Sequence, residues 1–165
     1  MQILLVGYML IILCPAAAGF LLSHTVKERL KRVEGAIELV RHCRYKVCDR
    51  LCPQNEIFMD FDNSALERCG FVTLLRSLDV SGGPILYRAL KSCPDIWDKK
   101  TYTVLNDFAR TLGNLNGRSQ AESCDHCISA LCLIYEKMNS TSEADMKLYR
   151  SMGMLTGVMT ALLLI

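Results

Sequence analysis

The sequence lacks the patterns on which most enzymes and nucleic-acid-binding proteins depend. It has no Walker phosphate-binding loop, no nucleophile motif, no internal repeat and no low-complexity tract. Its carboxylates are dispersed among basic residues, so no isolated pair is available for acid–base catalysis. The formal net charge of +2 is too close to zero to favour nucleic acid. We therefore expect neither an enzyme nor a cofactor.

Strict alternation of apolar and polar residues, the pattern of a half-buried strand, is also missing over any useful length. Apolar residues recur instead at steps of three and four, which is the spacing of one face of a helix. The sequence therefore predicts an all-α fold.

The last third of the chain, from Gly117 to Ile165, is predicted to form one long helix. Ser119 and Glu122 form a capping box, in which each side chain satisfies a backbone N–H group at the start of a helix. The short polar side chains from Asn139 to Ser142 predict a break or bend, because they compete for backbone hydrogen bonds. A stripe of the kind that a partner helix covers precedes them: Ala121, Cys124, Ile128, Leu131, Tyr135 and Met138.

The start of the chain mirrors its end. Ile3 to Leu22 carries no charge and is long enough to cross a hydrocarbon core of about 30 Å as a helix. The stripe that follows is interrupted at Arg44 and ended by Pro53, which cannot continue a helix. Two such long helices are most simply packed antiparallel. The second stripe consists of Val26, Leu30, Val33, Ile37, Val40, Val47 and Leu51.

Both apolar ends are predicted to be transmembrane helices, at residues 3–22 and 149–165, around a helical domain at residues 26–148. Because basic residues flank this domain on both sides, the positive-inside bias places it in the cytoplasm. Gly153 and Gly157 have the spacing that lets another membrane helix approach closely. Two interpretations compete: a signal peptide cleaved after Ala18, and a buried terminal core helix at the C-terminus. The flanking basic residues are Lys27, Arg29, Lys31, Arg32, Lys147 and Arg150.

Nine cysteines leave the choice between packing, metal binding and redox chemistry open. Several lie among apolar neighbours, where cysteine behaves as a small hydrophobe, and packing is the favoured interpretation. A zinc site would need two ligand pairs brought together. His126, beside the apolar stripe, is interpreted as a boundary residue rather than a ligand. The cysteines for which metal binding stays open are Cys43, Cys48, Cys52, Cys124 and Cys127.

Shorter helices are predicted for the middle of the chain. A second capping box, Ser64 and Glu67, starts a helix that extends to Leu78. Pro84 suits the first turn of the next helix, Ile85 to Lys91. Thr101 is the predicted cap of a helix from Tyr102 to Leu112, and Gly113 lies where a left-handed C-cap is expected.

The order of residues along the chain resembles that of the stage III sporulation protein AB family of spore-forming bacteria. The resemblance rests on Leu112-Gly113 after a helix, Gln120 at the opening of a long helix, and Leu148 to Gly153 leading into Gly157 and an apolar terminus. Ala65 to Phe71 in the middle also takes part. The match covers essentially the whole chain.

This resemblance implies a two-pass protein of the mother-cell membrane, in the channel that joins mother cell and forespore. It implies a cytoplasmic domain similar to those of F-type secretion platform proteins, which docks a cytoplasmic ATPase and anchors other channel proteins. Arg110 and Gly113 are then expected near a partner-binding corner, and Gly153 and Gly157 between membrane helices. Membrane lipid is an expected partner, and self-association of the chain is left open.

Two other classes of function stay open at this point. One is an exported helical binding domain held by disulfides, which requires cleavage after Ala18 and oxidised cysteines. The other is a membrane-attached zinc or thiol-redox protein, which requires bound metal or a thiol of low pKa at Cys124 or Cys127.

Overall fold

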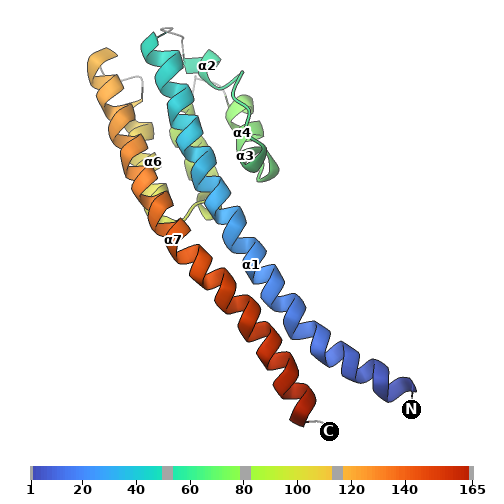
Figure 1. The fold of residues 1–165 in the computed structure, drawn as a ribbon. Helices are drawn as coiled ribbons and strands as arrows, with labels where there is room; N and C mark the ends of the chain where they lie inside the picture. Colours follow the sequence, from blue (N-terminus) through green and yellow to red (C-terminus); the bar gives the residue numbers. More distant parts are fainter. Residues whose placement is uncertain (1, 50–53, 79–82, 113–116, 164–165) are drawn as a thin grey trace. The chain divides into compact units, whose positions relative to one another are not determined.

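The computed structural model describes residues 2–49, 54–78, 83–112 and 117–163, and every regular element in these ranges is helical (Figure 1). The predicted all-α class is confirmed. The elements in chain order are α1 (Gln2–Arg44), the π-helix η1 (Tyr45–Asp49), α2 (Gln54–Ile57), α3 (Ser64–Arg68), α4 (Phe71–Ser77), α5 (Ile85–Ser92), the 3-10 helix η3 (Pro94–Ile96), α6 (Lys99–Thr111) and α7 (Gly117–Leu163).

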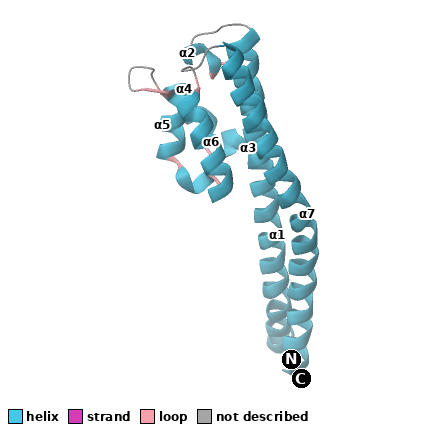
Figure 2. Ribbon diagram, turned by 90° about the vertical axis from the view of Figure 1, so that its left-hand side faces the viewer, coloured by secondary structure: helices cyan, strands magenta, loops and turns pink. Residues whose placement is uncertain are grey.

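The chain separates into two compact units. The core unit is Arg29–Lys137, and the paired unit consists of Met1–Glu28 and Met138–Ile165. Within each unit α1 and α7 run antiparallel side by side, as the two views in Figures 1 and 2 agree. The predicted antiparallel pair of long helices is therefore present. In the part of the chain that the structure describes, no helix combines the length and the apolar character needed to cross a membrane.

The apolar stripe of α1 forms one wall of the core. Val33, Ile37 and Val40 are buried, as their spacing predicts, and Leu39 and Cys43 widen the buried face. The α-helix ends at Arg44, where the stripe is interrupted, and continues as η1. Arg44 reaches across to α7 instead, with its Nε 2.8 Å from Asp125 Oδ1. Leu51 and Pro53 lie outside the described residues.

The long helix α7 begins at Gly117, as predicted, but its first turn differs from the predicted capping box. Ser119 lies within that turn, and Glu122 Oε1 lies 3.6 Å from Arg118 Nε. The helix also runs unbroken through Asn139 to Ser142. The break predicted there is absent, and the Ser142 hydroxyl donates to the carbonyl of Met138, one turn back in the same helix.

The single helix predicted from Ser64 to Leu78 is wrong. Gly70 has a φ of 76°, a left-handed conformation, and it divides the segment into α3 and α4. The cap of α3 is Asn63 rather than Ser64: its Oδ1 accepts from the backbone N–H groups of Ala65 (3.1 Å) and Leu66 (3.0 Å). Asn63 also contacts α1, because its Nδ2 donates to Glu38 Oε2.

The starts of α5 and α6 also shift. Pro84 stands at the N-cap of α5, one residue before the first turn. The cap of α6 is Asp98, which accepts from the Lys100 N–H at 3.3 Å. The predicted cap, Thr101, is fully buried inside the first turn of α6. Gly113, the predicted C-cap, lies outside the described residues.

Helices α3 to α6 pack in sequence beside the two long helices and complete the core. The ring of Phe71 in α4 meets Trp97 edge-on, with centroids 5.1 Å apart and planes at 85°. Short links hold α2 and its neighbours to the rest. His42 Nε2 lies 2.8 Å from the carbonyl of Ile57, and Arg76 donates to the carbonyl of Phe61 at 2.7 Å.

Candidate functional site: a charged groove between α1 and α3

A close contact between α1 and the start of α3 builds the candidate site. Gly35 is the residue of α1 at this contact. A Cβ atom there would lie 2.8 Å from Asn63 Oδ1 and 2.9 Å from Leu66 Cγ, closer than real Cβ atoms come. Only glycine therefore allows α3 to approach so near. The Asn63 side chain is fixed at both ends, because its Oδ1 caps α3 and its Nδ2 donates to Glu38 Oε2 at 2.7 Å.

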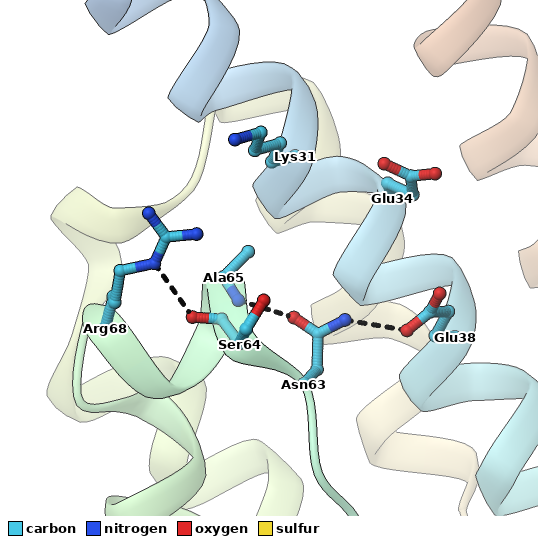
Figure 3. Close-up of a pocket in the computed structure, with 7 residues that line it drawn as sticks. All are labelled: Lys31, Glu34, Glu38, Asn63, Ser64, Ala65 and Arg68. Carbon is cyan, nitrogen blue, oxygen red and sulfur yellow. Dashed lines mark hydrogen bonds between the residues drawn. The ribbon is translucent and has the colours of Figure 1, made fainter.

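The two helices enclose a groove of about 280 Å³ beside this contact (Figure 3). Figure 3 shows the ammonium of Lys31 and the guanidinium of Arg68 toward one end, and the carboxylates of Glu34 and Glu38 toward the other. The positive and negative side chains are thus separated within one groove. Its lining comes from α1 and from the α3 entry: Lys31, Glu34, Glu38, Asn63, Ser64, Ala65 and Arg68.

No sequence motif pointed to this groove. Gly35 is a lone glycine inside a predicted helix, and Asn63 precedes a serine that is an equally good cap. The spacing of Lys31, Glu34 and Glu38 does place them on one face of α1. That helix spacing was the available signal, but which face α3 would cover depends on contacts between residues far apart in the chain.

Three cysteines from α1 and α7 meet in the core. Burial raises the pKa of the Cys43 thiol, and the nearby Cys124 and Cys127 raise it further. Burial, with Cys124 beside it, also raises the pKa of Cys127 to about 12. A thiol with a raised pKa is protonated near neutral pH and is a poor nucleophile and ligand. These two cysteines are therefore built into the core as apolar groups.

The structure bears on the other metal-ligand hypotheses only in part. Within the described ranges, no three His, Cys, Asp or Glu side chains are arranged to hold a metal ion. The side chains of Cys48 and Cys52 lie outside the described part. His126 is exposed, as expected of a residue at the boundary of the buried stripe.

The residues predicted to bind partners do not all fall within the described part. Arg110 is exposed on α6, and its guanidinium carbon lies 5.5 Å from the centre of the Tyr87 ring on α5. Gly113 lies outside the described residues, and Gly153 and Gly157 lie within α7 at positions whose surroundings are not described. The groove and Arg110 involve different helices, α1 with α3 and α5 with α6 respectively. Partner binding by Arg110 and Gly113, and membrane-helix packing by Gly153 and Gly157, stay predictions.

The paired unit presents an apolar stripe along α7. Four large apolar side chains there are between 53% and 64% exposed, so the α1 segment of the same unit does not cover them. Their spacing of four, three and four residues places them on one face of the helix. The stripe consists of Leu148, Met152, Leu155 and Met159.

These features define a class: an all-helical protein built on two long antiparallel helices, with a small core unit and an apolar stripe on its terminal helix. The chain belongs to the stage III sporulation protein AB family, whose model matches residues 4–165. A role in sporulation follows from this membership. The resemblance seen in the order of the residues is thereby confirmed. Neither the curated proteins nor the solved structures contain a match to the chain.

Proposed function

We propose that this protein is a non-enzymatic membrane component of the channel between mother cell and forespore. Its paired unit is the anchor, and its core unit is a cytoplasmic platform that docks an ATPase and holds other channel proteins. Membership of the sporulation family supports the setting. The proposal of a membrane anchor rests on the exposed apolar stripe of α7, together with the absence of charged side chains after Arg150.

The physical reason for a membrane anchor is the cost of leaving the stripe in water. Each large apolar side chain gains about 1.5–3 kcal/mol when it is removed from water. Lipid chains surround a membrane-embedded helix pair on every side, so they would cover all exposed apolar faces of the paired unit. The uncharged segment from Ile3 to Leu22 on the neighbouring helix fits the same surroundings.

Cysteine labelling in sporulating cells tests this arrangement. We expect a membrane-impermeant thiol reagent to label the half-buried Cys69, Cys93 and Cys132 only after permeabilisation, because the core unit faces the cytoplasm. The buried Cys43 and Cys127 should react only after denaturation, since their thiols are both inaccessible and protonated. They serve as an internal control for intact folding. Labelling of the half-buried cysteines in intact cells, or release of the protein by alkaline carbonate, would contradict the proposal.

The docking of an ATPase is tested separately at Arg110. If this exposed cation pairs with a partner carboxylate, Arg110→Glu should weaken co-purification of the ATPase by about tenfold and lower spore yield. Arg110→Lys keeps the charge, and Lys99→Glu makes the same reversal on an exposed position of α6; both should leave co-purification near the wild-type level. Unchanged co-purification with Arg110→Glu would remove Arg110 from the docking surface.

A further inference from the structure

The groove between α1 and α3 has a charge arrangement that suits one particular partner. Lys31 and Arg68 lie toward one end, and Glu34 and Glu38 toward the other (Figure 3). A partner with carboxylates opposite the first pair and cations opposite the second would be complementary to this arrangement. The groove itself carries both sets, in that order and with no net charge.

A two-fold axis through the groove would produce this complementary arrangement. In a symmetric dimer the same patch occurs on both copies, so that a residue i contacts j and the partner's j contacts i. Rotation by half a turn brings the cationic end of one copy over the acidic end of the other, and does so twice. Like charges are kept apart by the same operation. We propose that this groove is a self-association surface, and that it faces the same groove of a second copy of the chain.

The side chains have the reach and the support for such a contact. Lys31, Glu34, Glu38 and Arg68 are all exposed, and long side chains of this kind can extend their charged ends into solvent, although Arg68 Nε also donates to the carbonyl of Ser64 at 3.1 Å. Glu38 is held in place because Asn63 donates to its Oε2, which leaves its other oxygen able to accept from a second copy. The close contact at Gly35 holds α3 near α1, so the side chains from the two helices stay in one groove.

Exposed ion pairs are individually weak and are screened by salt. Association through this surface is therefore expected to be modest in solution and to fall as ionic strength rises. Any tether that concentrates copies near one another would strengthen it without new contacts. The self-association inference holds whether or not the paired unit is a membrane anchor.

Charge exchange tests the inference on the full chain in a mild detergent. The double variant Lys31→Glu/Arg68→Glu makes the groove wholly acidic, and Glu34→Lys/Glu38→Lys makes it wholly basic. We expect the wild-type chain to self-associate, with weaker association in 0.5 M salt, and each double variant to lose about tenfold or more in association constant. An equal mixture of the two variants should associate at least as tightly as the wild-type chain. Crosslinking and native mass spectrometry with differently tagged copies measure association in the wild-type chain, in each double variant and in the mixture.

The mixture separates a charge effect from misfolding, because two misfolded variants would not regain association when they are mixed. Lys99→Glu/Lys100→Glu, on exposed positions of α6, is the matched reversal and should associate like the wild-type chain. A wild-type chain that stays monomeric at every concentration would overturn the proposal. So would double variants that associate normally, or a mixture that does not recover association. Binding of the groove to a different protein with no self-association would likewise assign the surface to that partner instead.

Discussion

Gly35→Ala is expected to lower the free energy of unfolding of the core unit by about 1–2 kcal/mol. Alanine in place of glycine inside a helix would otherwise be favourable by about 1 kcal/mol. The added Cβ would lie 2.8 Å from Asn63 Oδ1 and 2.9 Å from Leu66 Cγ, so α3 must move or its cap must break. Neither is easy, because Asn63 is hydrogen-bonded at both ends of its amide and Leu66 is fully buried.

The fluorescence of Trp97 during denaturant unfolding measures this change. Trp97 is the one tryptophan of the chain and is buried in the core unit, so its signal reports on that unit alone. Glu34→Ala, at the exposed neighbouring position, should change stability by no more than about 0.5 kcal/mol. Combining Gly35→Ala with Asn63→Ala should cost less than the sum of the two, since the clashing oxygen is then gone. A stabilising Gly35→Ala would show that α3 does not sit on α1 at this point.

Sequence reasoning recovered the long-range plan of this protein better than its helix ends. The α1 and α7 stripes could be predicted because apolar residues recur at helical spacing, which a sequence displays directly. Val33, Ile37, Cys124 and Leu131 of these stripes are buried. The all-α class and the family followed from the same ordered pattern. None of this required knowledge of which residues meet across the fold.

The helix starts were misplaced where local signals competed. Asn63 and Ser64 are both good caps, as are Asp98 and Thr101, and tertiary contacts decided between them. Asn63 is favoured because its amide also reaches Glu38 of α1, while Thr101 is buried and unavailable to a helix start. Gly70 was included in a helix because glycine inside a run gives no sign of a positive φ.

The candidate groove could not be predicted for a related reason. Its two walls come from residues some thirty positions apart, and their contact depends on the missing side chain of Gly35. A lone glycine in a helix is compatible with many roles. Only the approach of Asn63 and Leu66 gives it a role, and this approach brings Arg68 into the same groove as Lys31 (Figure 3).

Phe71→Ala is expected to be the most damaging of the substitutions considered, with a loss of about 3–5 kcal/mol. Phe71 opens α4 and is fully buried, and its ring meets Trp97 edge-on at 5.1 Å. Its removal leaves a cavity beside Trp97, where α4 packs against the end of η3. It also deprives Trp97 of an aromatic contact worth about 0.5–1.5 kcal/mol, part of the same total. Domains of this kind have only about 5–15 kcal/mol of stability, so much of it would be lost.

Far-UV circular dichroism during urea unfolding should be recorded beside Trp97 emission, because this substitution changes the surroundings of the reporter itself. Phe71→Leu keeps most of the buried volume but loses the edge-on ring contact, and should cost clearly less than Phe71→Ala. Thr73→Ala, exposed on the same helix, should stay within about 0.5 kcal/mol of the wild-type chain. If Phe71→Ala cost no more than Thr73→Ala, α4 would not be packed against Trp97. The packing of α4 against the segment that contains Trp97 would then be wrong.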